Sequence, residues 1–272
     1  MMVTDHGGKL AAQAELNAGV WRTGRYLTEY DRAHLEPAEA LLLARYRDDL
    51  SGRVLDVGCG AGRFLNYLVA LGAEAHGLDI APRMVAHCLE RFPGVDVRVG
   101  DLRSLPETVE GPFDAILLSD NVLDVLDDDE RRSSLADIHG LLAHDGLLVF
   151  SSHNLWAWEH PLISQARRPG PARMLMERPL GWVLRCAWRL PRRRANRRRL
   201  APRQRRASEY AIVNDASHDF GLLHYYISRA QQERQLSELG FRPIEVLEFD
   251  GRPVAGGENG RGGSLYYAAR AV

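Results

Sequence analysis

The chain has few cysteines, and they do not form a metal-binding or disulfide pattern. It contains three, Cys59, Cys88 and Cys186, an odd number without CxxC spacing, which argues against a disulfide scaffold and against a zinc site. The 272-residue sequence also lacks a charged leader followed by a long apolar core, and no apolar run reaches about eighteen residues. We therefore expect a reduced, cytoplasmic protein without an export signal or a membrane span.

Lysine is nearly absent, so arginine carries almost all the positive charge. Lys9 is the only lysine, and the formal net charge is −1. The charge is unevenly spread, because residues 160–210 hold fifteen arginines against Glu177 and Glu209, which makes this segment +13 and leaves −14 elsewhere. Its densest part, RLPRRRANRRRLAPRQRR (189–206), has a composition typical of nucleic-acid contacts.

From Gly52 onward the sequence alternates apolar runs, glycine turns and helical stretches, which is typical of βαβ units. Its first, fourth and fifth predicted strands are continuously apolar, as expected for strands buried on both faces of a parallel sheet. Before the fifth strand, Asp127 and Glu130 have the spacing of a capping box and predict a helix. The predicted strands are 53–58, 74–79, 95–100, 113–119 and 147–152.

The βαβ rhythm breaks after Ser152 and resumes at a helix predicted between Ser228 and Gly240. Two further strands, 243–251 and 263–271, are expected to pair antiparallel. This pattern predicts an α/β fold with a mostly parallel, seven-stranded sheet, helices on both faces, and a helical cap inserted after the fifth strand. The predicted parts are an N-terminal helical lead-in or lid (1–50), a core (51–154), an Arg-rich cap (155–225) and the C-terminal part of the core (226–272).

The first predicted strand of the core (53–58) runs into a glycine-rich turn, in the stretch VLDVGCGAGRF (54–64). Gly58, Gly60 and Gly62 would let a ligand lie against bare main chain, but several nucleotide-binding folds use such a turn. Asp79 ends the next strand, 21 residues after Gly58. A carboxylate at this position accepts hydrogen bonds from both hydroxyls of a ribose.

Two residues help to choose between possible ligands of this turn. Asp56 stands just before the glycines, where an acid suits the ammonium group of S-adenosylmethionine better than the pyrophosphate of a dinucleotide. Arg63 stands where the dinucleotide fingerprint GxGxxG has its last glycine. Both residues favour S-adenosylmethionine.

In these motifs the sequence resembles the class I S-adenosylmethionine-dependent methyltransferases. VLDVGCGAGR looks like their first motif, GLDIAPRMV (77–85) like their second, VRVGDLRSLP (97–106) like their adenine-side loop, and 113–154 like their block of fourth and fifth strands. The resemblance covers most of residues 24–154 and, more loosely, 225–272. It implies a Rossmann-like fold, methyltransferase activity and S-adenosylmethionine as the cofactor.

The resemblance also implies which residues contact the cofactor. Asp56, Gly58 and Gly60 would hold the methionine end of the cofactor. Asp79 would accept hydrogen bonds from its ribose hydroxyls, and Asp101 would accept one from its adenine amino group. Two alternatives stay open, since Asp101 is also suited to capping a turn and Ser119 to ending a strand. The implied cofactor-binding residues are Asp56, Gly58, Gly60, Asp79, Ile80, Asp101, Leu102 and Ser119.

More narrowly, SDNVLD (119–124) and SSHN (151–154) resemble a bacterial branch of these enzymes with S-x-N-G-x-D-Y after the fourth strand and SSHN at the end of the fifth. The stretch 214–241 resembles the same branch. Val122 and Val125 replace the glycine and the tyrosine of that pattern. Because these departures fall after the fourth strand, they concern contacts to the substrate rather than to the cofactor.

Residues after the fourth and fifth strands are candidates for acting on the methyl acceptor, because ligands bind at the carboxyl ends of parallel strands. His153 is the predicted general base, with holding a loop as its alternative role. Asp124 is the second catalytic candidate, and it would anchor a substrate amine or cap a helix. No metal ligand is predicted. The predicted substrate-binding residues are Tyr26, Tyr30, Asn121, Asn154, His224 and Tyr226.

The leading hypothesis is methyl transfer to an O or N nucleophile of a small molecule or peptide, in specialised natural-product metabolism, beneath the Arg-rich cap. An RNA or tRNA methyltransferase is the alternative, since the arginines could contact phosphates. Against it, no NPPY-like motif follows the fourth strand. A non-catalytic binding protein and a membrane-surface helix at 179–194 are weaker alternatives. The acceptor and the oligomeric state stay open.

Overall fold

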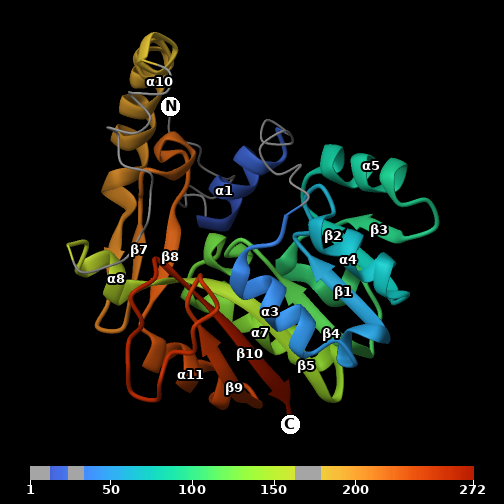
Figure 1. Cartoon of the computed structure of the whole chain (residues 1–272). Coiled ribbons are helices and arrows are strands. Elements are labelled where there is room, and N and C mark those ends of the chain that lie inside the picture. Colours follow the sequence, from blue (N-terminus) through green and yellow to red (C-terminus); the bar gives the residue numbers. More distant parts are fainter. Residues whose placement is uncertain (1–12, 24–33, 163–178) are drawn as a thin grey trace.

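One mixed sheet with helices on both faces organises the chain in the computed structural model (Figure 1). The structure describes residues 13–23, 34–162 and 179–272, with the side chains of 179–188 left out. Within these residues the sheet has ten strands, in the order β3-β2-β1-β4-β5-β8-β7-β6 along one path, while β10 joins β5 and β9.

The seven strands predicted from the sequence form the centre of this sheet, in the order β3-β2-β1-β4-β5-β10-β9. The first five run parallel, and β10 is antiparallel to both β5 and β9. The α/β, Rossmann-like prediction is therefore confirmed. These strands are β1 (Arg53–Val57), β2 (Glu74–Asp79), β3 (Asp96–Val99), β4 (Phe113–Leu118), β5 (Leu142–Asn154), β9 (Phe241–Leu247) and β10 (Ser264–Ala271).

Two apolar clusters hold helices against the two faces of the sheet. Successive strand residues alternate between them, so that Leu55 joins one cluster and Val54 the other. Leu135 and Leu236 bring α7 and α11 to the first face, and Leu65 brings α4 to the second. Strands covered on both faces are apolar throughout, as their sequences predict. The helices of this core are α3 (Pro37–Arg45), α4 (Arg63–Leu71), α5 (Pro82–Arg91), α6 (Leu105–Thr108), α7 (Asp128–Leu141) and α11 (Arg229–Glu238).

The insertion after β5 is not purely helical, which corrects the prediction of a helical cap on a seven-stranded sheet. Besides α8 (Leu155–Glu159) and α10 (Pro179–Leu200), it contributes β6 (Arg205–Arg206), β7 (Tyr210–Val213) and β8 (His224–Ile227). Parallel pairing of β8 with the end of β5 makes these strands an extension of the sheet. They escaped prediction because runs of two to four residues are too short to show a periodic pattern.

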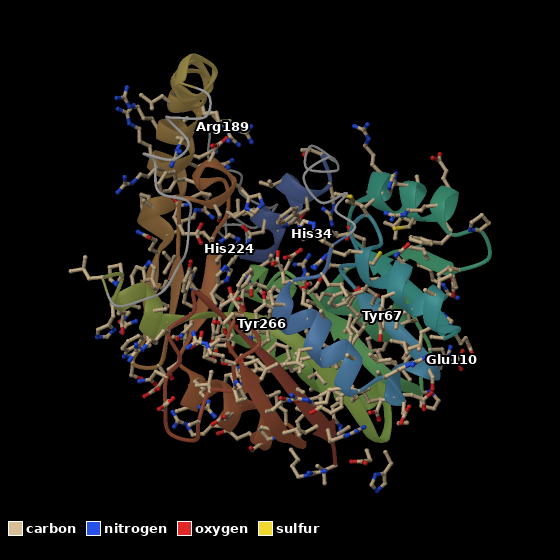
Figure 2. All side chains as sticks on the ribbon, viewed as in Figure 1. His34, Tyr67, Glu110, Arg189, His224 and Tyr266 are labelled. Carbon is tan, nitrogen blue, oxygen red and sulfur yellow. The ribbon has the colours of Figure 1, made fainter. Side chains whose placement is uncertain are left out.

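One face of the arginine-rich helix α10 contacts the turn at residues 217–220. Arg189 forms an ion pair with Asp219 at 3.1 Å, and the guanidinium groups of Arg193 and Arg197 lie 5.1 and 5.3 Å from the centre of the Phe220 ring. These three arginines are four residues apart and therefore share a face. Other arginine side chains project from α10 around Arg189 (Figure 2). Within the described ranges no helix, α10 included, is long and apolar enough to cross a membrane.

The turn that these arginines contact has a strained backbone. His218, Asp219 and Phe220, in the short 3-10 helix η5 (Ser217–Phe220), have φ values of 48°, 59° and 58°. A non-glycine residue in this left-handed region costs roughly 1–2 kcal/mol. Asn214 supports the turn by donating to the carbonyl oxygen of Phe220 at 2.9 Å. Part of the arginine segment therefore stabilises a turn of its own chain.

Replacing both Arg193 and Arg197 with glutamine is expected to lower the free energy of unfolding by about 1–2 kcal/mol, since an exposed cation–π contact contributes roughly 0.5–1 kcal/mol. Urea denaturation measures the change. Arg194→Gln with Arg198→Gln is the matched control, because both side chains are exposed on the same helix and have no ring contact to Phe220 among those described. An equal loss in the control pair would contradict the assignment.

Candidate active site

A pocket lies at the carboxyl ends of β1, β2 and β4 and beside the loop that follows β3. Helix α1 (Gln13–Trp21) contributes Ala14, Ala18 and Trp21 to its wall. The structure brings together here seven of the eight residues that the sequence predicts for the cofactor. The seven lining residues are Gly58, Gly60, Asp79, Ile80, Asp101, Leu102 and Ser119.

The glycine turn has the backbone that its sequence predicts. Gly58 and Gly60 have φ values of 71° and 54°, a region that glycine enters without steric cost. A Cβ on Gly58 would come within 2.6 Å of Cγ2 of Val122, so a side chain has no room there. Val122, which replaces a glycine of the resembled motif, thus packs directly on the turn.

Asp79 is fixed at the wall of the pocket by two backbone amides. Its carboxylate accepts hydrogen bonds from the N–H of Gly60 at 2.9 Å and from the N–H of Ala81 at 2.8 Å. Burial raises the pKa of this carboxyl group, and the two amides oppose the shift. The end of β2 therefore holds an acceptor group rigidly beside the glycine turn.

Asp56, the eighth predicted cofactor residue, lies buried before the glycine turn and outside the pocket lining. Its side chain is 1% exposed, and its Oδ1 atom has no hydrogen-bond partner among the described residues. Burial raises the pKa of Asp56 to about 8, although the nearby Arg63 lowers it. A buried carboxylate oxygen without a partner is costly, and it marks a place where a cationic group of a ligand fits.

The loop after β3 and the end of β4 complete the pocket. Asp101 accepts from the backbone N–H of Arg103 at 3.0 Å and from its guanidinium at 2.7 Å. It therefore caps the 3-10 helix η2 (Leu102–Ser104), the alternative that the sequence left open, while it also lines the pocket. Burial alone would raise the pKa of Asp101, but Arg103 holds it below its usual value. Ser119 ends β4 at the pocket wall.

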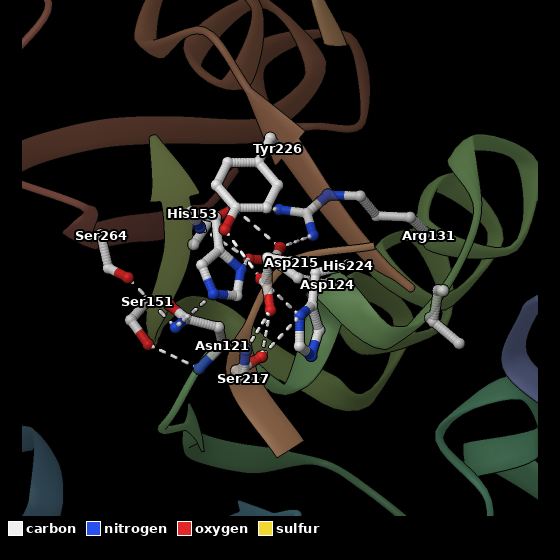
Figure 3. Close-up of polar contacts among 12 residues, drawn as sticks. Asn121, Asp124, Arg131, Ser151, His153, Asp215, Ser217, His224, Tyr226 and Ser264 are labelled. Atoms are coloured by element: carbon white, nitrogen blue, oxygen red, sulfur yellow. Dashed lines mark hydrogen bonds and ion pairs between the residues drawn. The ribbon is translucent and has the colours of Figure 1, made fainter. Parts of the chain in front are cut away.

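The two motifs that follow β4 and β5 meet in one hydrogen-bonded network (Figure 3). The backbone N–H of Asn121 donates to Oγ of Ser151 at 2.9 Å. Ser152 donates through Oγ to Asp124 at 2.8 Å. The backbone N and the Nδ1 atom of His153 lie 2.6 and 2.7 Å from the other carboxylate oxygen of Asp124. The network joins every residue of the two motifs that was predicted to be catalytic.

Asp124 acts from inside this network, because it is fully buried and cannot reach an acceptor. Its carboxylate contacts Nη1 of Arg131, itself fully buried, at 2.6 Å. Although burial alone would raise the pKa of Asp124, Arg131 and His153 hold it below its usual value. An ionised carboxylate only accepts, so Asp124 fixes a proton on Nδ1 of His153 and leaves Nε2 as the ring nitrogen that points away from it. Asp124 is thus a positioning residue for His153.

His224 and Tyr226 lie beside His153, as the sequence predicts for acceptor-side residues. The ring of Tyr226 stacks on that of His153 at 4.6 Å between centroids, and the ring of His224 lies 5.0 Å from it. Asp215, which sequence reasoning missed, accepts from Tyr226 Oη at 2.8 Å and contacts Nδ1 of His224 at 2.8 Å. The sequence feature that could have identified Asp215 is its position in the stretch 214–241. This stretch resembles the same enzyme branch as SDNVLD (119–124) and SSHN (151–154).

This cluster adjoins the pocket through Asn121. Its neighbours Asp120 and Val122 line the pocket, and its side-chain nitrogen lies 3.3 Å from Nε2 of His153. Asn154 is not part of the cluster, because its buried side chain donates to the carbonyl oxygens of residues 259 and 262 and holds the loop before β10. Tyr26 and Tyr30 lie outside the described residues.

Comparison with protein families agrees with this architecture. Residues 54–146, about a third of the chain, match the family model of a methyltransferase domain. The chain is similar to a ubiquinone biosynthesis O-methyltransferase of Xanthomonas axonopodis pv. citri, with 39% identity over 92 residues that make up 32% of this chain and 34% of that protein. The match thus spans about a third of the length of this curated relative.

Among solved structures, the fold is similar to the CcbJ methyltransferase from Streptomyces caelestis, with a TM-score of 0.57, 16% identity and coverage of 93% of this chain and 97% of that one. It is also similar to the glycopeptide N-methyltransferase MtfA in complex with S-adenosyl-L-homocysteine, with a TM-score of 0.54, 17% identity and coverage of 87% and 90%. The protein has the Rossmann-like fold of the class I S-adenosylmethionine-dependent methyltransferases.

Proposed function

We propose that the protein transfers a methyl group from S-adenosylmethionine to an oxygen or nitrogen of a small molecule or peptide. The observation that carries this proposal is the pocket at the carboxyl ends of β1, β2 and β4, which gathers seven of the residues predicted for the cofactor. A histidine with a fixed tautomer adjoins it. Cofactor site and proton acceptor are therefore neighbours.

The residues present fit S-adenosylmethionine. The unpartnered oxygen of Asp56 suits its ammonium group, and the carboxylate of Asp79 suits its ribose hydroxyls. Ile80 and Leu102 give the pocket an apolar part for the adenine ring. When bound, the cofactor supplies an electrophilic methyl group on a sulfonium. The protein must then align the acceptor with the S–CH₃ bond and exclude water.

His153 is the catalytic residue in this proposal. With the cofactor bound, the acceptor atom would receive the methyl group, and Nε2 of His153 would take the proton that this atom releases. Asp124, 2.7 Å from Nδ1, stabilises the imidazolium that results. Tyr226, stacked on the ring, keeps it in this orientation.

A small molecule or peptide is the acceptor class that we favour. The relatives named above include an O-methyltransferase of ubiquinone biosynthesis and a glycopeptide N-methyltransferase, and we place this protein in specialised metabolism by analogy with the second. An RNA acceptor has less support once the contacts of the arginine segment are taken into account than it has from the sequence alone. Arg189, Arg193 and Arg197 contact the turn 217–220, which gives this part of the arginine segment a role within the protein's own fold.

The affinity for S-adenosylmethionine is expected to rise with pH up to about 8. Burial raises the pKa of Asp56 to about 8, so at lower pH its carboxyl group holds a proton that it must release before it pairs with the ammonium group. Each pH unit below that value then weakens binding by up to about tenfold. Isothermal titration calorimetry in buffers of different ionisation enthalpy measures both the affinity and the proton release.

Asp56→Asn is the control for this pH dependence, since an amide has no proton to release. It should bind the cofactor weakly and with a flat pH profile. A flat profile for the unmodified protein would contradict the role of Asp56. Absence of S-adenosylmethionine binding at every pH would overturn the proposed function itself.

A further inference from the structure

Three side chains from separate elements converge beside the acceptor side of the pocket (Figure 3). His153 ends β5, His224 begins β8, and Asp215 lies in the loop between β7 and η5. One ring nitrogen of each histidine and one carboxylate oxygen all lie within 4.8 Å of one another. Two imidazoles and a carboxylate form a ligand set that zinc and other divalent transition metals favour.

The distances between these atoms are close to those around a bound ion. Ligand atoms around a tetrahedral zinc, at about 2.1 Å from the metal, are about 3.4 Å apart. Nδ1 of His224 and the Asp215 carboxylate are already 2.8 Å apart. All three ligand atoms lie within 4.8 Å of one another, so a bound ion would need to draw the His153 atom and the other two ligand atoms only slightly closer.

Neighbouring groups orient these ligands as in established metal sites. Metal-binding histidines usually donate their second ring N–H to a carboxylate, and Nδ1 of His153 does so to Asp124. Asp215 is held through its other oxygen by the backbone N–H of Ser217 at 2.8 Å. The carboxylate is therefore fixed in place.

The charges that face the cluster also favour a cation. Arg131 and Asp124 form a buried pair and balance each other. Arg189 pairs with Asp219 on the far side of η5. The carboxylate of Asp215 then leaves a negative charge between the two imidazole rings.

We propose that His153, Asp215 and His224 bind one divalent transition-metal ion, with open coordination positions toward the acceptor. Three protein ligands with open positions are typical of catalytic rather than structural metal sites. If the proposed methyl transfer holds, a hydroxyl acceptor coordinated to the ion has a lowered pKa and loses its proton more readily. In the metal-bound protein the lone pair of His153 coordinates the ion, so this histidine is not the general base. In the metal-free protein it remains the base.

The test uses the full chain, stripped of metal with EDTA and titrated with Co²⁺ alone. The visible absorption of Co²⁺ reports nitrogen and oxygen coordination, and elemental analysis after dialysis against Zn²⁺ gives the stoichiometry. We expect one ion per chain. His224→Ala and Asp215→Asn should each weaken binding by at least about tenfold, as is typical when a metal site loses one contributing group.

His144→Ala is the matched control, because this histidine is exposed on β5 and far in the strand from His153; its Co²⁺ affinity should equal that of the unmodified protein. Thermal unfolding and S-adenosylmethionine binding establish that the His224→Ala and Asp215→Asn chains are folded. Substoichiometric binding by the unmodified protein, or equal affinity in all variants, would overturn the metal site.

Separate measurements distinguish failure of the metal site from failure of the proposed function. Cofactor binding and methyl transfer that survive EDTA unchanged, without Co²⁺ coordination, refute the metal site and leave a metal-independent methyltransferase. Stoichiometric Co²⁺ binding that needs Asp215 and His224, in a chain that does not bind S-adenosylmethionine, refutes the proposed function and leaves the metal site.

Discussion

Replacing His153 with glutamine is expected to lower kcat for methyl transfer by roughly 10²–10⁴-fold, the range typical of losing a general base. Glutamine keeps a polar side chain of similar reach but takes up no proton at neutral pH. The affinity for S-adenosylmethionine should not change, because His153 lies outside the pocket lining. The rate is measured with labelled cofactor and an acceptor found by screening, over a range of pH.

The pH profile separates catalysis from a merely structural role of His153. The pH–rate profile of the His153→Gln variant should differ from that of the unmodified protein, because glutamine cannot accept the proton of the acceptor. His144→Ala, an exposed histidine on the same strand, should keep both rate and profile. A variant at His153 with the rate and profile of the unmodified enzyme would eliminate it as the base.

Asp124→Asn should reduce the rate in the same direction, because an amide next to Nδ1 no longer fixes the tautomer. It should also destabilise the fold by about 3–5 kcal/mol, the typical cost of leaving a buried charge unpaired, since Arg131 is fully buried beside it. Urea denaturation measures this loss. The substitution at His153 removes no partner of Arg131 and is therefore the cleaner test of catalysis.

Asp79→Ala is expected to weaken binding of S-adenosylmethionine by roughly 10²-fold or more. A hydrogen bond to a charged group contributes about 1.5–3 kcal/mol, and this carboxylate is placed to receive two from a ribose. The change also removes the acceptor of the Gly60 N–H, which loosens the glycine turn. Calorimetric titration measures the affinity.

Asp96→Ala provides the control for Asp79, because this carboxylate lies on the adjacent strand β3 and pairs with the exposed Arg98. Its cofactor affinity should match that of the unmodified protein. If Asp79→Ala binds as tightly as Asp96→Ala, the ribose assignment is wrong, and with it the cofactor geometry on which the proposed function rests.

The sequence predicted best where local patterns and spacing determine the structure. Buried parallel strands are continuously apolar, and the turn after β1 needs glycine because of its positive φ values. Asp79 was found because the end of β2 lies at a fixed spacing from that turn. These features depend on residues close in sequence or on a repeated βαβ geometry, so the pattern and the family resemblance together identify seven predicted cofactor residues that line one pocket.

The acceptor side could not be predicted in the same way, because its contacts join distant parts of the chain. Arg131 reaches Asp124 from within α7, and nothing in an amphipathic helix pattern marks an arginine as fully buried. Asp215 meets His153 only through the pairing of β8 with β5. Likewise, the arginine segment looks uniformly solvated until the contacts of Arg193 and Arg197 with Phe220 appear.

The pairing of β8 with the end of β5 determines how an acceptor can enter. His153 and Asn154 pair with Tyr226 and Ile227, so the insertion is joined to the same strand that carries the proposed base. Swinging it away as a hinged lid would break this ladder and remove the rings of His224 and Tyr226 from beside His153. Helix α1 is attached differently, by side-chain amides such as Asn17 to the carbonyl oxygen of Leu223 at 2.7 Å. The insertion is therefore a fixed wall next to the proposed base, and it limits the shape of an acceptor that can reach His153.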